Sequence, residues 1–269
     1  MLPNENTLLH PVSMKIRLLP SNLSDPARLQ PLTCFLINDA LAIDGGSLGL
    51  ALGLEAQRLV RQIIVTHSHS DHIASLPVFI AEAFPFLQEP VHIFGTREVI
   101  ASLKTHVFND EIWPDFHQIN LLDGSGSGLR YVEIKPLVPF TIGDLRITAV
   151  WTNHTVPTTG LAVEGDHSAV IFTSDTYHTE DIWRLANQTD RLKAVFVDVS
   201  YPSDMESLAA DSKHLTPQGL KKELAKLHKE VSIFAVHLKP QYRARVAQEL
   251  HDLNLPNLFI GEINRDYVF

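Results

Sequence analysis

Four metal-binding side chains lie within six residues of this chain, in the segment HSHSDH at positions 67–72. His67 and His69 are two residues apart, so in an extended segment both imidazole rings point to one side and can hold one ion. The aspartate and the histidine that end the segment can turn toward a second ion. Residues 62–66 form an apolar run that predicts a buried strand before it. A polar surface turn is the alternative interpretation, but such a turn has no need of three histidines and an aspartate.

Three further candidate ligands stand where apolar strands are expected to end. His154, Asp175 and His237 follow the apolar runs 145–151, 169–173 and 231–236. Each of them alone is also consistent with a turn or capping residue. Because the same placement recurs three times, we predict a two-metal site with these ligands: His67, His69, Asp71, His72, His154, Asp175 and His237.

The composition limits the classes of protein to which the chain can belong. At 269 residues with 45 % hydrophobic and 20 % charged side chains, it is expected to fold as one globular domain. A net charge of −9 gives no general attraction for nucleic acid. Cys34 is the only cysteine, which excludes an internal disulfide and a metal site built on several thiolates. No apolar run of signal-peptide or membrane-spanning length follows the polar first residues, so we expect a cytoplasmic protein with no membrane contact.

Hydrophobic patterning predicts the elements that must position the ligands. Strands are expected at 14–19, 33–37, 41–43, 62–66, 91–94, 145–151, 161–164, 169–173, 194–199 and 231–236. Helices are expected at 48–61 and 76–86, and after Thr216-Pro217 and Pro240. The segment 105–136 contains GSGSG at 124–128 and predicts a flexible lid or insert. This order fits an α/β (α+β) four-layer αββα sandwich, although periodicity does not choose it over other α/β folds.

The order HxHxDH, His, Asp, His is similar to that of the metallo-β-lactamase superfamily. Within it, several segments resemble the class II cyclic-nucleotide phosphodiesterases: THSHSDHIASLP (66–77), NH (153–154), SDT (174–176), VDVSYP (197–202), SKHLTP (212–217), HLKP (237–240) and the insertion-like IWPDF (112–116). The similarity runs from about residue 30 to 245. Ser70, Ser174 and Tyr177-His178 depart from that family's usual residues, and the last pair could alter the pocket floor.

The resemblance implies a metallo-β-lactamase-type αββα sandwich and a division of the ligands. His67, His69 and His154 would hold one divalent ion, Asp71, His72 and His237 the other, and Asp175 would bridge both. Zinc is the favoured metal, and manganese or iron also suits such a site. The implied reaction converts cAMP or cGMP to the nucleoside 5′-monophosphate through a hydroxide shared by the two ions.

Asp71 and His214 are the candidate catalytic residues. The alkoxide that leaves in this reaction needs a proton, and His214 is the expected general acid or phosphate binder. The alternative is that it only precedes the helix cap Thr216. Asp198, at the end of an expected strand, could orient a ligand histidine. His178 is a weaker candidate for substrate contact.

Other functions stay open at this point. The fold could serve another phosphodiester, such as a tRNA 3′-end or a small cyclic phosphate, or it could be a catalytically silent metal-binding sensor. The expected partner is a small cyclic nucleotide and no polymeric nucleic acid, and a homodimer is an open alternative. The remaining histidines are expected at surface or packing positions: His10, His92, His106, His117, His167, His228 and His251.

Overall fold

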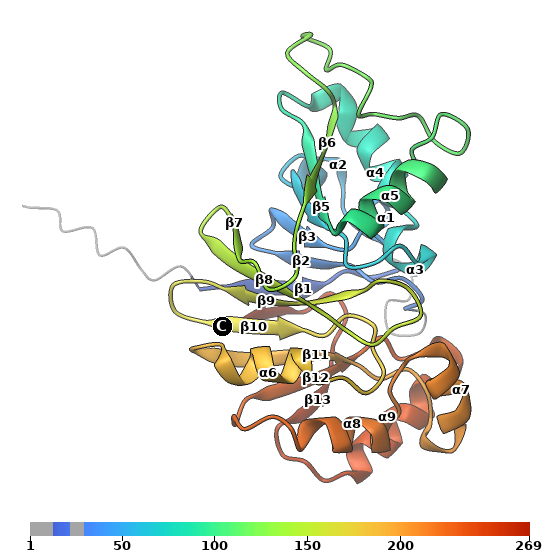
Figure 1. Cartoon of the computed structure of the whole chain (residues 1–269), viewed down its shortest axis with the longest axis vertical. Helices are drawn as coiled ribbons and strands as arrows, with labels where there is room; N and C mark the ends of the chain where they lie inside the picture. Colours follow the sequence, from blue (N-terminus) through green and yellow to red (C-terminus); the bar gives the residue numbers. More distant parts are fainter. Residues whose placement is uncertain (1–12, 22–29) are drawn as a thin grey trace, which may run out of the picture.

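Two seven-stranded sheets face each other in the computed structural model of the chain, which describes residues 13–21 and 30–269 (Figure 1). The strand orders are β14-β1-β2-β3-β4-β5-β6 and β13-β12-β11-β10-β9-β8-β7. The predicted four-layer αββα sandwich is thereby confirmed. His10 lies outside the described residues. No helix in the described part of the chain is long and apolar enough to cross a membrane.

The first sheet changes from antiparallel to parallel pairing at β3. Strands β14, β1, β2 and β3 pair antiparallel, and β3, β4, β5 and β6 pair parallel. Their bounds are β1 Lys15–Leu18, β2 Phe35–Ile37, β3 Leu41–Ile43, β4 Gln62–Ile64, β5 Val91–Gly95, β6 Leu129–Glu133 and β14 Asp266–Val268. The parallel part brings the carboxyl ends of β3 and β4 to one edge of the sheet, directly before Asp44 and the 67–72 segment.

The second sheet repeats this change at β10. Strands β7 to β10 pair antiparallel, and β10 to β13 pair parallel. Their bounds are β7 Phe140–Ile142, β8 Leu145–Trp151, β9 Thr159–Glu164, β10 Ala169–Phe172, β11 Leu192–Asp198, β12 Ser232–Val236 and β13 Leu258–Ile260. The carboxyl ends of β10, β11 and β12 therefore lie side by side, and each leads into a candidate site residue.

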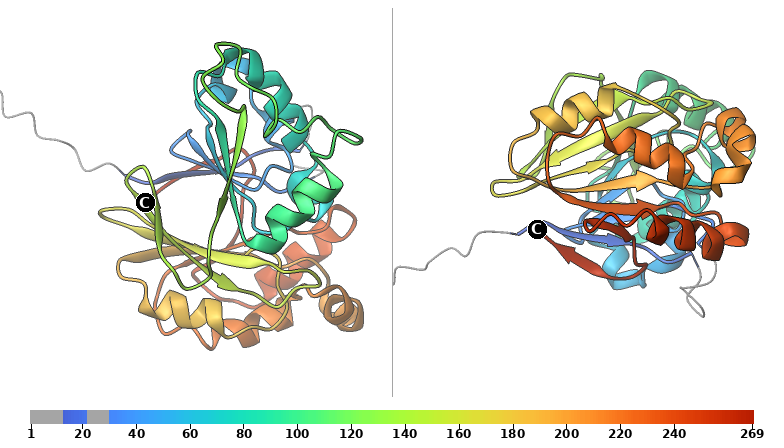
Figure 2. Two further views of the ribbon diagram at one scale, coloured as in Figure 1. Left: turned by 45° about the horizontal axis from the view of Figure 1, so that its top comes forward. Right: turned by 90° about the horizontal axis from the view of Figure 1, so that it is seen from below.

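Helices cover the outer face of each sheet, as the two further views in Figure 2 show. On the first sheet, the apolar face packs against α1, α4 and α5, and on the second against α6, α8 and α9. The bounds are α1 Leu48–Ala51, α2 Leu54–Gln57, α3 Ser70–Ile73, α4 Leu76–Ala83, α5 Arg97–His106, α6 Asp181–Gln188, α7 Glu206–Ser212, α8 Pro217–Leu224 and α9 Arg243–Asp252, with 3-10 turns at η1 Phe84–Phe86, η2 Ser203–Met205 and η3 Pro240–Tyr242.

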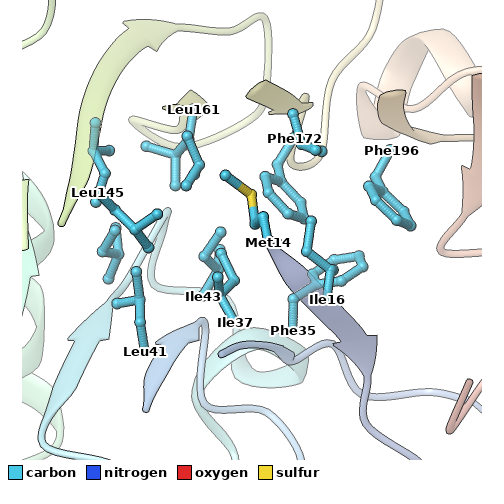
Figure 3. Close-up of a cluster of buried hydrophobic side chains, with 14 of the residues drawn as sticks. Met14, Ile16, Phe35, Ile37, Leu41, Ile43, Leu145, Leu161, Phe172 and Phe196 are labelled. Carbon is cyan, nitrogen blue, oxygen red and sulfur yellow. The ribbon is translucent and has the colours of Figure 1, made fainter. Parts of the chain in front are cut away.

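The main core lies between the two sheets (Figure 3). Ile16, Phe35 and Ile43 from the first sheet face Phe172 and Phe196 from the second, and all are at least nine-tenths buried. The two phenylalanines of the second sheet stack with ring centroids 5.3 Å apart, and Phe35 meets both edge-on. Such aromatic packing fixes the spacing of the sheets, and hence the distance between ligands that come from different sheets.

Two predicted elements differ in the structure. The single helix expected over 48–61 is wrong, because Gly53 has extended dihedrals (φ −67°, ψ 160°) and separates α1 from α2. The segment 105–136, expected to be a lid or insert, begins within α5 and contains β6, which pairs with β5. Its irregular parts are therefore residues 107–128, where Phe108 and Trp113 form an isolated bridge, and the last three residues after β6.

Candidate metal centre

Every predicted ligand lies at the same edge of the sandwich, just past the end of a strand. His67, His69, Asp71 and His72 follow β4, and the last two belong to the short helix α3. His154 is in the hairpin after β8, Asp175 follows β10 and His237 follows β12. Ligand atoms of the seven residues form two groups, each within 4.8 Å: His67, His69, His154 and Asp175, and then Asp71, His72, Asp175 and His237.

The first group is built mainly from histidines. His154 Nε2 lies 3.0 Å from His69 Nδ1, and Asp175 Oδ2 lies 3.7 Å from His67 Nε2 and 3.9 Å from His154 Nε2. These separations are typical of atoms that surround one central position, since two tetrahedral ligands each about 2 Å from zinc are a little over 3 Å apart.

The second group shares the same carboxylate oxygen. Asp175 Oδ2 lies 3.3 Å from His72 Nε2 and 3.4 Å from His237 Nε2. Asp71 Oδ2 lies 3.5 Å from His237 Nε2. Because Asp175 faces both groups with one buried oxygen, it occupies the position of a bridging ligand.

Hydrogen bonds on the far side of each ring select the nitrogen that faces the centre. His72 Nδ1 lies 2.6 Å from Asp44 Oδ2, and His154 Nδ1 donates to the backbone oxygen of Lys213 at 3.0 Å. His237 Nδ1 lies 3.0 Å from the hydroxyl oxygen of Thr33. In each case Nε2 is the nitrogen that faces the other ligand atoms, which is the arrangement found around metal-binding histidines.

The donor set fits divalent metal ions. The Nε2 atoms of His67 and His72 are buried and have no hydrogen-bond partner. Burying such a nitrogen is costly unless another group, such as a metal ion, binds it. Burial lowers the pKa of His67 well below its usual value and lowers that of His237 to about 4, so both rings are neutral and available as ligands at pH 7. The buried His and Asp groups are therefore consistent with a binuclear site for metals that prefer N and O ligands.

Asp175 and His72 form a strongly coupled pair within this centre. Burial alone would raise the pKa of Asp175, but the charges of His237 and His72 hold it well below its usual range. Burial would likewise lower the pKa of His72, but Asp175 and Asp44 raise it well above its usual value. An ion that binds His72 Nε2 must therefore compete with a proton for that nitrogen.

His214 lies beside both groups without belonging to either. Its ring stacks on that of His237 with centroids 5.4 Å apart and meets that of His154 edge-on at 5.1 Å. Asp198 Oδ2 lies 2.7 Å from His214 Nδ1, and Ser200 donates to the other oxygen of that carboxylate at 2.7 Å. Burial lowers the pKa of His214, but the charge and hydrogen bond of Asp198 outweigh this and raise it above its usual value.

Comparison with known proteins adds one decisive observation. The family model described as "Beta-lactamase superfamily domain" matches residues 51–237, which is more than half of the chain.

The chain belongs to the metallo-β-lactamase superfamily.

Two kinds of relative agree with this membership. A probable 3′,5′-cyclic-nucleotide phosphodiesterase of Yersinia pestis is 26 % identical, over 86 % of this chain and 79 % of its own length. Among solved structures, unliganded yeast PDE1 superposes with a TM-score of 0.75 at 19 % identity over 96 % of this chain and 99 % of its own. The metallo-β-lactamase fold protein YhfI of Bacillus subtilis gives 0.74 at 15 % identity over 96 % and 99 %. At these identities, the two structures show the shared fold.

The other predicted residues of this metallo-β-lactamase-superfamily protein have different surroundings. Asp198 contacts His214 and not a metal-ligand histidine, which differs from the prediction. His178 Nδ1 lies 2.7 Å from the buried carboxylate of Glu223, which also accepts from Trp183 Nε1 at 2.6 Å. This bond ties the loop after Asp175 to α8. The scattered histidines in the described part of the chain contribute to neither ligand group: His92, His106, His117, His167, His228 and His251.

Three residues of the centre are missing from the sequence prediction. Asp44 holds His72, Thr33 holds His237, and Lys239 Nζ lies 2.8 Å from His237 Nε2. Asp44 comes directly after the apolar strand β3, just as the predicted ligands come after apolar strands. The sequence pattern that identified those ligands was therefore also present at Asp44. Thr33 and Lys239 have no comparable signal, because their roles depend on contacts across the fold.

Proposed function

We propose that this protein is a metal-dependent 3′,5′-cyclic-nucleotide phosphodiesterase that hydrolyses cAMP, cGMP or both to the nucleoside 5′-monophosphate. The observation that carries the proposal is the Asp198–His214 pair, which lies beside a centre suited to two divalent ions. The similarity to the Yersinia pestis relative over most of both chains supports a cyclic nucleotide over other phosphodiesters.

His214 is suited to the role of general acid. Asp198 accepts a hydrogen bond from Nδ1–H, so Nε2 is the nitrogen that can give a proton to substrate. Its raised pKa keeps a larger fraction of the ring protonated near neutral pH than an ordinary histidine would have. A positioned acid of this kind typically contributes 10²–10⁴-fold to the rate.

The bonds and protons of the proposed reaction balance with one water molecule. The water oxygen forms a bond to phosphorus, and the bond from phosphorus to O3′ breaks with its electron pair on O3′. His214 gives its proton to O3′, and the proton lost by the water returns the ring to its charged form. Bound at the two groups, divalent ions would supply the acidity of that water and offset charge on the phosphoryl oxygens.

The remaining residues hold this arrangement in place. Asp71, the other catalytic candidate, acts through the ion it would hold at the second group, together with His72 and His237. Asp175 keeps the two groups in register because one of its oxygens faces both. Zinc is the metal that we propose for both positions, and manganese and iron are the alternatives for this donor set.

A substrate panel tests the proposal. We expect cAMP or cGMP to give a kcat/KM at least 100-fold higher than those of a tRNA precursor and of a simple five-membered cyclic phosphate. His69→Ala should abolish the activity, with the exposed His251→Ala as the control that retains it. Turnover confined to the tRNA precursor or to the simple cyclic phosphate would assign a different phosphodiester, and no turnover by metal-loaded protein would favour a silent sensor.

A further inference from the structure

The two ligand groups differ in their surroundings, because a lysine reaches only one of them. Lys239 Nζ lies 2.8 Å from His237 Nε2 and 3.5 Å from Asp71 Oδ2. Both of these atoms belong to the second group. In the described part of the chain, Asp175 has histidines and neither lysine nor arginine within ion-pair distance.

The backbone around Lys239 fixes this contact. Its N–H bonds to the backbone oxygen of Ser200 at 3.3 Å, and Leu238 before it is buried in the core against the second sheet. Pro240 follows and restricts Lys239 to extended dihedrals (φ −59°, ψ 128°). The side chain is only 23 % exposed, so its ammonium lies at the second group and not in bulk solvent.

The other lysine near the centre is directed elsewhere. The backbone oxygen of Lys213 holds His154, but its ammonium lies 5.4 Å from the ring centroid of Tyr177. Among the described residues, the first group therefore has no ammonium in hydrogen-bond contact with a ligand atom, whereas the second has that of Lys239.

We propose that Lys239 competes with the metal ion of the second group, so that the first group fills with metal before the second. His237 Nε2 has a single lone pair, which either accepts a proton of the ammonium or binds a metal ion. The same ammonium also lies 3.5 Å from Asp71 Oδ2, which belongs to the same group. A metal ion entering the second group must displace the Lys239 ammonium, and its affinity is lowered by that displacement. This proposal rests on the metal centre of the proposed function and does not depend on the substrate.

Metal titration of the metal-free full-length protein tests the competition. Zn²⁺ would be titrated against a chromogenic chelator into wild type, Lys239→Met, Lys239→Arg and the remote control Lys193→Met, which removes an exposed charge at the start of β11. We expect two affinities in the wild type, and in Lys239→Met a second-site affinity at least 10-fold tighter with the first unchanged. Lys239→Arg, which keeps a cation, and Lys193→Met should each stay within about 2-fold of wild type.

Other results would overturn the proposal. An unchanged or weaker second site in Lys239→Met would mean that the lysine does not oppose the metal. Circular dichroism would verify folding, and Lys239→Gln provides a second uncharged variant if the methionine variant fails to fold. The metal titration and the activity assay distinguish this proposal from the proposed function. If the protein binds two ions in this order but leaves cyclic nucleotides intact, the competition by Lys239 stands and only the assignment of the substrate is wrong.

Discussion

Asp44 Oδ2 lies 2.6 Å from His72 Nδ1, and both side chains are almost completely buried. The same carboxylate accepts from the backbone N–H and the hydroxyl of Thr66, which directly precedes His67. One buried carboxylate thus holds His72, a ligand of the second group, and also Thr66, the residue before the first-group ligand His67. Burial raises the pKa of Asp44, although the charge of His72 opposes this.

Asp44→Asn is expected to weaken the second metal position. An amide can turn its NH₂ group toward His72 Nδ1 and so favour the tautomer that carries hydrogen on Nε2, which cannot bind metal. Loss of such a carboxylate partner typically lowers metal affinity about 10–100-fold. The measurement is a zinc titration of the metal-free protein. Asp39→Asn is the matched control, because Asp39 also has a positive φ (56° against 62°) but lies at the opposite end of β3. Equal affinities in the two variants would contradict this role for Asp44.

His214→Gln should slow cyclic-nucleotide hydrolysis far more than hydrolysis of an ester whose leaving group needs no proton. We expect kcat to fall about 10²–10⁴-fold on cAMP or cGMP. On bis-nitrophenyl phosphate, whose phenolate is a good leaving group, the fall should be less than about 10-fold. Steady-state kinetics on both substrates check this, with His251→Gln on the surface of α9 as control. An equal loss on both substrates would indicate that His214 binds phosphate or holds the metal centre.

Asp198→Asn should move the pH profile of kcat to lower pH. A general acid works in its protonated form, so activity is lost as pH rises through the pKa of His214. Asp198 raises this pKa, and without the charge of Asp198 the loss must begin at lower pH. The pH dependence of kcat on a cyclic nucleotide, measured at saturating metal, checks the shift. A profile whose alkaline limb stays in place, or moves to higher pH, would exclude His214 as the titrating acid.

The same pair should contribute to stability in the metal-free protein. Because the folded pKa of His214 lies above its unfolded value, its contribution is fully present below about pH 6.5 and is lost as pH rises through the folded pKa. The difference in free energy of unfolding between wild type and Asp198→Asn should therefore shrink from pH 6 to pH 9. Urea unfolding in the presence of chelator measures it, and a difference that grows with pH would contradict the assignment.

Gly46→Ala should destabilise the loop that supports the second ligand group. A Cβ there would lie 2.0 Å from the backbone oxygen of Asp71 and 2.6 Å from that of Thr33, so backbone must move. We expect a loss of about 3 kcal/mol or more in the free energy of unfolding, as in severe overpacking. Gly53→Ala is the control, because its Cβ would meet no atom within 4 Å and its φ of −67° suits alanine. Denaturant unfolding compares the two, and similar stabilities would show that the loop adapts freely.

Much of the ligand set can be predicted from sequence because its positions follow one rule. His154, Asp175 and His237 each come after an apolar run, and parallel pairing of β10, β11 and β12 brings the ends of neighbouring strands together. Local patterning contains this information. Asp44 obeys the same rule after β3, but its Asp-Gly-Gly context is equally typical of a turn, and its partner is 28 residues away.

Elements whose formation depends on distant partners were not predictable in this way. β14 has three residues and pairs with β1, which begins more than 240 residues earlier in the chain. β6 lies within the segment interpreted as a lid. It was not predicted as a strand because its partly exposed residues show no clear apolar run and its strand geometry comes from pairing with β5. The contact of Lys239 with His237 Nε2 likewise depends on the turn fixed by Pro240 and Ser200. Long-range pairing and side-chain direction thus account for most of what local patterns miss.

Hydrolysis of cAMP and cGMP in water enriched in ¹⁸O, with the product identified by chromatography and mass spectrometry, tests the central claim most directly. The metal-loaded protein is expected to release only the nucleoside 5′-monophosphate, with one ¹⁸O atom in its phosphate group, because water attacks phosphorus and O3′ leaves. Asp175→Asn, which changes the carboxylate shared by both ligand groups, should release none. Intact cyclic nucleotide in the presence of protein that holds two metal ions, or a 3′-monophosphate as product, would contradict the account.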